Sequence, residues 1–302
     1  MVQAGANKLR FDGQVAIITG AGGGLGRLYA MALAARGAGV VVNDVGSSVN
    51  GEGAATGPAE SVAREIQELG GEAVPDTNTV ATSEGGRAIL ATALEAFGRV
   101  DVLVNNAGAL RDKAFHNLSD EQLQTVLDVN LTGAFYVTRP VWARMREQGY
   151  GRVLMVTSSS GLLGNFGQSN YAAAKMGLVG LTRVLAAEGA KVNIKVNAIA
   201  PLARTRMTEG LFGELESKLA PELVVPAVIW LVHRDVPVSG EVFSAAGGRV
   251  ARFFVGLTRG YWDPALTPET LRDHMADVLD EDGYSVPAGL AEELAQLRDV
   301  LP

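Results

Sequence analysis

Short β-branched apolar runs alternate with helix-length segments along most of the chain. The runs cover residues 15–19, 40–43, 102–105, 153–157 and 194–199. Continuous apolar strands that are separated by helices are typical of a parallel sheet with both faces covered. The pattern therefore predicts an α/β fold built on a doubly wound parallel sheet.

The segments between these runs carry the pattern of helices. Residues 25–36 are rich in alanine and leucine and stop before Gly37. Residues 59–69 end at Gly70-Gly71, where a left-handed residue can terminate a helix. Both segments are expected to be helices that connect parallel strands.

Two stretches interrupt the alternation. Residues 46–57 are rich in Gly and Ser and exceed the roughly two to six residues of a usual strand-to-helix joint, which indicates a surface insertion. After Gly248 the alternation ceases, and the Thr-Pro pair at 267–268 can begin an amphipathic helix. We therefore expect a single domain over residues 1–248 with a helical C-terminal extension over residues 249–302.

Composition and charge exclude several classes of function. The 302 residues include 33 acidic and 26 basic side chains, and the net charge of −7 would repel a nucleic-acid backbone. The chain has no cysteine, which excludes disulfides, thiol nucleophiles and cysteine-ligated metals. His116, His233 and His274 are far apart in sequence, so we expect no metal site.

No segment of the sequence has the pattern of an address or a membrane anchor. Residues 1–12 are polar and lack the apolar core of a signal peptide, and no apolar run reaches spanning length. The last three residues, Val-Leu-Pro, do not form a peroxisomal address of the Ser-Lys-Leu kind. We therefore expect a cytoplasmic location without membrane association.

A glycine-rich loop follows the first apolar run and leads into a helix. Its motif positions are Gly20, Gly24 and Gly26, with Leu25 between the last two. In this context the glycines permit positive φ and let the backbone approach a pyrophosphate at the helix N-terminus, as in a Rossmann-type fold.

Asp44 ends the second strand, 18 residues beyond Gly26, close to the separation at which an acid binds the adenosine ribose hydroxyls. Gly23 and Val45 supply no cation for a 2′-phosphate, so NAD is favoured over NADP. The alternative interpretation is that Asp44 is a loop acid that caps a turn.

Tyr171 and Lys175 are the strongest candidates for chemistry. Their four-residue spacing puts a phenol and an ammonium on one face of a helix. A cation close by is expected to lower the pKa of the phenol, which could then take a proton from an alcohol or return one to a ketone. Separately, each has a plain alternative, a packed aromatic ring for Tyr171 and a solvated helix face for Lys175.

With the run Asn105-Asn106-Ala107-Gly108, these motifs resemble the short-chain dehydrogenase/reductase family. The resemblance implies an oxidoreductase that acts on an alcohol or a ketone with NAD(H) or NADP(H). It implies that Asn106, Ala107 and Gly108 hold the sheet near the adenosine ribose. The position that commonly carries an adenine-contacting Asp is Asn78 here, which departs from the family pattern.

The same resemblance completes a catalytic tetrad. Ser158, 13 residues before Tyr171, matches the family serine that bonds the substrate oxygen, and Ser159 and Ser160 are adjacent competitors. Asn130 matches the asparagine that kinks a long helix and orders a water in the proton relay to Lys175. A helix asparagine with only local bonds is the alternative for Asn130.

After the strand at 194–199, Pro201 matches the family segment beside the nicotinamide carboxamide, although Leu202 replaces the usual glycine. Residues 205–218 are expected to form a mobile lid over the substrate, with Thr205 as a cofactor contact.

Several stretches resemble one branch of the family, the (3R)-hydroxyacyl-CoA dehydrogenase unit of peroxisomal multifunctional enzymes of type 2. These stretches are residues 10–13, 41–44, 161–168 and 206–208. The resemblance implies a small-molecule acyl-CoA substrate whose chain runs under Leu162, Leu163 and Phe166. The alternatives are a hydroxysteroid or other bulky secondary alcohol and, in a different class, a non-catalytic NAD(H)-binding protein.

Family members usually pair their long helices across two-fold axes. The matching helices here cover residues 119–148 and 168–188. The resemblance therefore implies a homodimer or a homotetramer.

Overall fold

The computed structural model describes residues 8–48, 50–53, 57–205, 208 and 213–301. Its contacts divide the chain into two compact units, Met1–Arg252 and Phe253–Pro302. Each unit is described by itself. The predicted domain boundary after residue 248 stays a prediction, although the sheet of the first unit continues beyond it by one strand.

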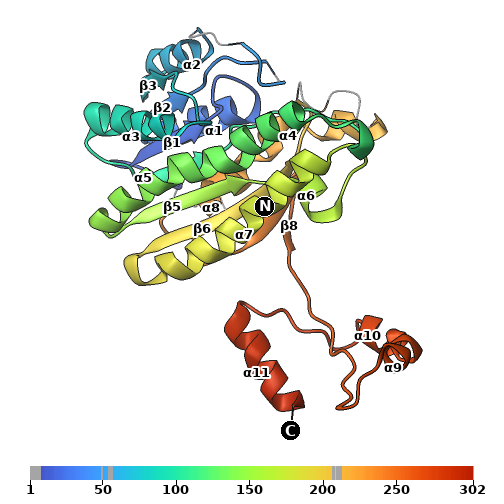
Figure 1. Cartoon of the computed structure of the whole chain (residues 1–302). Helices are drawn as coiled ribbons and strands as arrows, with labels where there is room; N and C mark the ends of the chain where they lie inside the picture. The colour runs from blue at the N-terminus through green and yellow to red at the C-terminus, as the bar shows by residue number, and fades with distance from the viewer. Residues whose placement is uncertain (1–7, 49, 54–56, 206–207, 209–212, 302) are drawn as a thin grey trace. The chain divides into compact units, whose positions relative to one another are not determined.

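An eight-stranded sheet forms the centre of the first unit (Figure 1). The strands are β1 (Val15–Thr19), β2 (Gly39–Asn43), β3 (Glu72–Asp76), β4 (Val102–Asn105), β5 (Gly151–Val156), β6 (Ile194–Leu202), β7 (Val242–Ala246) and β8 (Arg249–Phe253). Their order in the sheet is β3-β2-β1-β4-β5-β6-β7-β8, and β1 to β7 pair in parallel. The predicted doubly wound parallel sheet is therefore confirmed.

The central strands are apolar because both of their faces are covered. Every residue of β1, β2, β4 and β5 is buried, and Ile17 of β1 lies between Val41 of β2 and Leu103 of β4. A strand buried on both faces has no solvent side on which polar residues could alternate. The continuous apolar runs in the sequence have this origin.

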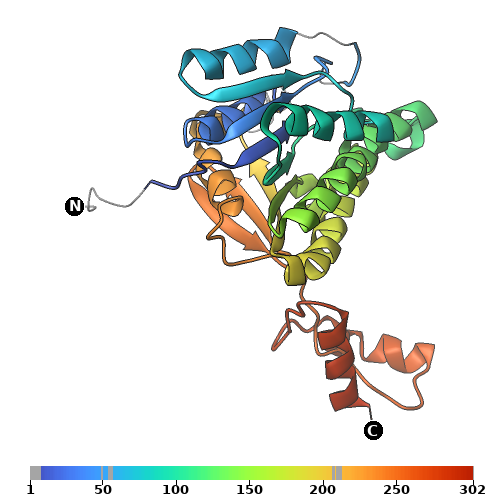
Figure 2. The same ribbon diagram turned by 90° about the vertical axis from the view of Figure 1, so that its left-hand side faces the viewer.

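Helices cover both faces of the sheet, as Figure 2 shows by colour. The helices on one face are α1 (Gly24–Ala34), α2 (Gly57–Glu68) and α8 (Val225–Leu231), and those on the other are α3 (Ser83–Phe97), α5 (Gly133–Gln148) and α7 (Ser169–Gly189). Large side chains of the core, such as Tyr29 and Leu33 of α1, are completely buried against the strands. This packing fixes the strand ends that carry the candidate site.

The predicted long helix over residues 119–148 is interrupted by one π-helical turn. It consists of α4 (Asp120–Leu127), the π turn η2 (Asp128–Thr132) and α5. Ser119 begins α4 with a capping box, and Gly149 ends α5 in the left-handed conformation. A π turn widens the helix locally and is frequent at functional sites. Here it contains Asn130.

The sheet ends in a hairpin that the sequence pattern did not predict. Gly247 and Gly248 connect β7 to β8 and have φ values of 55° and 83°. Two consecutive positive φ values suit the two-residue turns that join antiparallel strands. The eighth strand therefore forms one edge of a sheet whose other strands are parallel.

The described part of the second unit includes three helices. It contains α9 (Pro268–Asp273), α10 (Met275–Leu279) and α11 (Leu290–Val300). Thr267 caps α9 through its side chain, and Pro268 occupies the first turn. The predicted helix start at this Thr-Pro pair is confirmed.

Candidate active site

The predicted site residues meet at the carboxyl edge of the sheet. Thr19 ends β1, Asp44 follows β2, Asn106 follows β4, Ser158 follows β5 shortly after its end, and Pro201 lies within β6. In open α/β sheets, ligands bind outside the carboxyl ends of the strands where the strand order reverses. That reversal lies here between β1 and β4.

The glycine loop has a shape that larger residues would not permit. Gly20 has a φ of 65°, and a Cβ atom at this position would lie 2.8 Å from the Cα of Ala107. A Cβ on Gly26 would overlap the carbonyl of Gly20 and the side chain of Asn106. Gly24 also has a positive φ, 52°, with open space beside it.

The N-terminus of α1 is open to an anion. No side chain caps it at Gly23, and its first turn holds no acidic residue. The free backbone amides of a helix N-terminus attract phosphate groups. Together with the glycine cradle, these residues fit the pyrophosphate of a dinucleotide.

Asp44 is bonded to the glycine loop itself. Its Oδ2 accepts a hydrogen bond from the Gly22 amide at 2.8 Å, and its Oδ1 accepts one from the Gly46 amide at 2.7 Å. The capping role that we considered as an alternative is therefore present. Each carboxylate oxygen can accept further bonds, and ribose binding by Asp44 stays a prediction.

Asn106 joins the end of β4 to the glycine loop. Its side-chain amide donates to the carbonyls of Thr19 and Gly20 at 2.9 and 3.0 Å. The hydroxyl of Thr19 accepts bonds from the amides of Asn106 and Ala107, both at 3.0 Å. These contacts hold the cofactor edge of the sheet together.

Asn78 lies beyond β3, beside a buried acid. Its side-chain amide donates to Oδ2 of Asp76 at 2.8 Å, and its carbonyl accepts a bond from Asn43. Asp76 also accepts a bond from Thr92 at 2.6 Å. Asp76 therefore orders this loop, and an adenine contact by Asn78 stays a prediction.

Tyr171 and Lys175 lie on the same face of α7, as the spacing predicts. The Nζ atom of Lys175 lies 5.5 Å from the centroid of the Tyr171 ring and donates to the carbonyl of Val156 at 2.9 Å. Tyr171 forms a hydrogen bond with Ser158. Lys175 is buried, whereas Tyr171 and Ser158 are partly exposed, so the phenol and the hydroxyl are accessible to a ligand.

The predicted effect of Lys175 on Tyr171 is wrong for this structure. Burial raises the pKa of Tyr171 to about 12, although the hydrogen bond from Ser158 opposes this change. Burial also lowers the pKa of Lys175 to about 8. Loss of hydration disfavours the charged form of both groups, so it raises the pKa of the phenol and lowers that of the ammonium.

Asn130 is buried in the π turn and faces Lys175 across a glycine. Its Nδ2 donates to the carbonyls of Ala109 and Val126 at 2.9 and 3.0 Å, and its Oδ1 has no partner among the described residues. A Cβ on Gly108 would lie 2.8 Å from that oxygen and 3.7 Å from the Nζ of Lys175. The glycine thus leaves space between the two side chains.

A small cavity of about 10 Å³ adjoins Asn130, Asn105 and Thr19. Such a volume is near the lower limit for one water molecule. The geometry suits the water-ordering role that family resemblance implies for Asn130, and that role stays a prediction.

Asn170 is a positioning residue that the sequence analysis did not identify. It is buried, its Oδ1 accepts a bond from the Tyr171 amide at 2.8 Å, and its Nδ2 donates to the carbonyl of Arg111 at 3.1 Å. Gln168 donates to Asp112 at 2.7 Å. The segment before Tyr171 is therefore fastened to the loop after β4. No motif marks these polar residues, because their partners are distant in sequence.

One backbone hydrogen bond joins the two residues that flank the predicted lid. The amide of Arg204 donates to the carbonyl of Leu219 at 2.8 Å. The amide of Thr205 donates to the hydroxyl of Thr208 at 2.9 Å. Residues 206–207 and 209–212, which include part of the predicted lid, lie outside the described residues. The cofactor contacts expected of Pro201 and Thr205 stay predictions.

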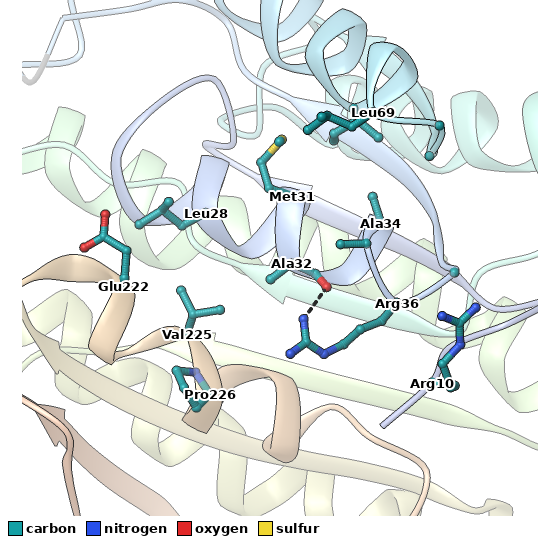
Figure 3. A pocket seen from close by; sticks show the side chains of 15 residues that line it. Arg10, Leu28, Met31, Ala32, Ala34, Arg36, Leu69, Glu222, Val225 and Pro226 are labelled. Atoms are coloured by element: carbon teal, nitrogen blue, oxygen red, sulfur yellow. Dashed lines mark hydrogen bonds between the residues drawn. The ribbon is translucent and has the colours of Figure 1, made fainter. Parts of the chain in front are cut away.

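A groove of about 630 Å³ lies along α1, away from these residues (Figure 3). Leu28, Met31 and Val225 line it, with Arg10 and Gly37. Arg10 precedes β1 and Gly37 precedes β2, so the groove extends toward the amino ends of the strands. None of the predicted site residues lines it.

Within the described ranges, no helix is long and apolar enough to cross a membrane. The same ranges contain no group of three His, Asp or Glu side chains that could hold a metal ion. His233 is buried and makes ring contacts with Phe11 and Trp230.

Comparison with known proteins gives consistent results. Residues 14–215 match the short chain dehydrogenase family. The peroxisomal multifunctional enzyme type 2 of Mus musculus is 45% identical over 301 residues, which are 98% of this chain and 40% of that protein. The predicted resemblance to this branch is therefore confirmed.

Two solved structures are similar to this chain. The full-length peroxisomal multifunctional enzyme type 2 of Drosophila melanogaster superposes with a TM-score of 0.82 and 37% identity, covering 97% of this chain and 50% of that chain. A 7α-hydroxysteroid dehydrogenase in complex with NADH and 7-oxoglycochenodeoxycholic acid has a TM-score of 0.71 and 31% identity. The match covers 79% of this chain and 95% of that chain. The chain thus spans half or less of the length of the Mus musculus and Drosophila melanogaster multifunctional enzymes.

The expected cytoplasmic location is wrong by these comparisons. Similar proteins from Mus musculus, Saccharomyces cerevisiae and Drosophila melanogaster are named peroxisomal enzymes. The expectation rested only on the lack of a recognised address in the sequence. An address is a short segment that a receptor reads, so neither composition nor fold fixes the compartment.

Proposed function

Because the chain belongs to the short chain dehydrogenase family, we propose that it transfers a hydride between NAD(H) and the 3-hydroxy or 3-keto group of a (3R)-hydroxyacyl-CoA. The observation that carries the proposal is the hydrogen-bonded pair Tyr171 and Ser158 beside the buried Lys175. All three lie at the sheet edge that bears the glycine loop. A bound nicotinamide would supply the hydride acceptor or donor.

Tyr171 handles the proton in this proposal. With a pKa of about 12, the phenol keeps its proton at neutral pH and can donate it to a ketone oxygen during reduction. In the oxidation direction it must accept a proton, which requires stabilisation of the phenolate when the site is filled. Lys175, with a pKa of about 8, still carries its charge at neutral pH and provides part of that stabilisation.

Ser158 and Asn170 set the geometry. Ser158 bonds the phenol and is partly exposed, so it can share the substrate oxygen with Tyr171. Asn170 accepts a hydrogen bond from the backbone amide of Tyr171 and donates one to the loop after β4, so it fixes the position of the Tyr171 backbone. Held groups of this kind lower the cost of orientation in the transition state.

The carboxylate of Asp44 supports NAD over NADP. It lies against the glycine loop, where its negative charge would repel a 2′-phosphate. The first basic residue of α1, Arg27, is paired with Glu65 and so does not offer a free cation there. NAD is therefore the proposed cofactor.

Exposed apolar side chains near the site support a long, partly apolar substrate. Leu163 and Phe166 are 74% and 90% exposed, on the segment that leads to Tyr171. Phe115, 80% exposed, follows a loop that is tied to the same segment by a 2.8 Å bond between the Lys113 amide and the Gly167 carbonyl. Grouped exposed apolar side chains often mark a binding surface, and an acyl chain would cover these.

A hydroxysteroid is the second candidate substrate. The similarity to a solved hydroxysteroid dehydrogenase favours it, and a fused ring system would also cover Leu163 and Phe166. A non-catalytic NAD(H)-binding protein is the weakest alternative, because such a protein has no need of a phenol and a buried ammonium beside the cofactor loop.

A substrate panel tests the proposal. The purified protein is assayed with NAD on (3R)-hydroxyacyl-CoA esters of several chain lengths and on 3-, 7- and 17-hydroxysteroids, with Tyr171→Phe as the blank. We expect the acyl-CoA esters to have the highest kcat/KM. A steroid that is oxidised far more efficiently than every ester would establish the second candidate, and the absence of turnover on all of them would favour the non-catalytic alternative.

A further inference from the structure

The insertion after β2 forms an ordered turn. The Ser48 amide donates to the Glu52 carbonyl at 2.8 Å, and the Gly51 amide donates to the Ser48 carbonyl at 2.9 Å. The hydroxyl of Ser48 also accepts a bond from the Glu52 amide at 3.3 Å. Residues 49 and 54–56 of the insertion lie outside the described residues. These hydrogen bonds therefore fix the positions of Gly51 and Glu52 in the turn.

This turn contacts the loop that follows β4. A Cβ on Gly51 would lie 3.3 Å from the Cβ of Ala109 and 3.6 Å from the methyl group of Thr125, and the φ of Gly51 is 80°. The Glu52 carboxylate lies 2.9 Å from the guanidinium of Arg111. An apolar contact and an ion pair thus attach the insertion to residues that follow β4, at the carboxyl edge of the sheet.

The sheet order shows what the insertion crosses. It leaves the end of β2 and reaches the residues that follow β4, and β1 lies between these two strands. The carboxyl end of β1 carries the glycine loop and the open N-terminus of α1. The insertion therefore bridges the edge at which a dinucleotide binds in sheets of this kind.

Arg111 connects the insertion to the catalytic side. Its side chain is only 19% exposed, its Nε is buried without a partner in the described part of the chain, and Glu52 is the carboxylate that pairs with it there. Its carbonyl accepts the bond from Asn170, the neighbour of Tyr171. The Glu52 side chain is 66% exposed, so the ion pair is partly exposed and contributes a modest stabilisation.

We propose that residues 46–48 and 50–53 form a strap across the cofactor site, and that the ion pair of Glu52 with Arg111 holds this strap in place and slows the release of NAD(H). This inference rests on the proposed cofactor. Glu52 and Arg111 are positioning residues in it, since neither carries out chemistry. Such a strap accounts for an insertion that is longer than a strand-to-helix joint requires.

The release rate of NADH tests the strap directly. Stopped-flow fluorescence is used to measure NADH dissociation from wild type, Glu52→Gln, Arg111→Gln and the double variant. The control is Glu68→Gln, an exposed acid of α2 without an ion pair among the described residues. We expect each single variant to speed release about two- to five-fold, the range for a partly exposed ion pair. The double variant should be no faster than the single ones.

Two further readouts separate a strap from a general structural role. Hydrogen exchange at residues 50–53 in the protein without ligand should be faster in Glu52→Gln than in Glu68→Gln. High salt should speed NADH release from wild type and leave Glu52→Gln nearly unchanged, because only the former has the ion pair to screen. Charge reversal of both residues, Glu52→Arg with Arg111→Glu, should restore slow release.

Several results would overturn the inference. Release of NADH from Glu52→Gln at the rate of Glu68→Gln, or additive effects in the double variant, would show that the pair does not retain the cofactor. A change in the KM for acyl-CoA with unchanged NADH release would assign Arg111 to the substrate instead. Failure of wild type to bind NADH at all would be a different outcome, because it would refute the proposed cofactor and the strap together.

Discussion

The carboxylate of Asp44 accepts a hydrogen bond from the backbone amide of Gly22 at 2.8 Å. The same residue thus shapes the glycine loop and places a negative charge beside it. A Cβ on Gly22 would lie 2.9 Å from that carboxylate, so the close approach requires glycine. Cofactor choice and loop geometry are therefore coupled through one side chain.

Substitution of Asp44 should separate these two roles. Asp44→Asn keeps an oxygen that can accept one amide bond but removes the charge, whereas Asp44→Ala removes both. We expect Asp44→Asn to narrow the preference for NAD over NADP about ten-fold or more. The reason is that repulsion between two negative charges, the carboxylate and the 2′-phosphate of NADP, costs over about 1 kcal/mol. Asp44→Ala should also weaken NAD binding. The measurement is kcat/KM with each cofactor, and equal efficiency with NADP in the unmodified protein would refute the assignment.

Tyr171→Phe should remove turnover while leaving NADH binding almost intact. The variant loses the proton donor, and loss of a general acid typically costs about 10²- to 10⁴-fold in rate. The glycine loop is untouched by this change. NADH titration and steady-state turnover are compared with Tyr284→Phe, an exposed tyrosine of the second unit. Full activity of Tyr171→Phe would show that another group moves the proton.

Lys175 should make the stability of the protein depend on pH. Its pKa falls from an ordinary value of 10.5 to about 8 in the fold, so between these values the unfolded chain binds a proton that the folded protein does not. Stability then rises with pH in this window, by up to about 3 kcal/mol. Below pH 8 the full penalty for the buried charge is present.

Urea unfolding of wild type and Lys175→Met at fixed protein concentration measures this effect. The difference in unfolding free energy between the two proteins should shift in favour of wild type as the pH rises from about 8 to about 10.5. A difference that stays constant across this range would show that the ammonium is not buried as the structure has it.

The sequence was sufficient for the strands that are buried on both faces. β1 and β4 have the predicted bounds, because a strand without a solvent side produces a continuous apolar run. β3 was not identified, since only two of its five residues are buried and it includes Pro75. β8 was also missed, because most of its residues are exposed and no apolar run marks it.

The shared helix face of Tyr171 and Lys175 could be predicted from their spacing, whereas the pKa values of the two groups could not. A four-residue spacing in a helix places Tyr171 and Lys175 on one face, and the structure confirms this arrangement. The pKa of each group depends on its burial, which residues from elsewhere in the chain bring about. For the same reason Asn170 and Arg111 escaped notice, although they fasten Tyr171 and the insertion.

Self-association is expected through the long helices. Phe135 of α5 is 41% exposed, and Met176 and Val184 of α7 are 41% and 55% exposed, so both helices offer apolar side chains to a partner. We expect a dimer or tetramer by light scattering at micromolar concentration. Val184→Glu should shift it toward smaller species, whereas Leu69→Glu, at the exposed residue that follows α2, should not. Monomeric elution of wild type would contradict this expectation.

The stereochemistry of the substrate tests the proposed function most directly. If the 3-hydroxyl must lie between Ser158 and Tyr171, only one epimer can direct its hydrogen toward the nicotinamide while its chain lies along Leu163 and Phe166. The measurement is kcat/KM with NAD for the (3R) and (3S) epimers of one hydroxyacyl-CoA. We predict efficient oxidation of the (3R) epimer and rejection of the (3S) epimer by about 10²-fold or more, and equal rates or a preference for (3S) would contradict the account.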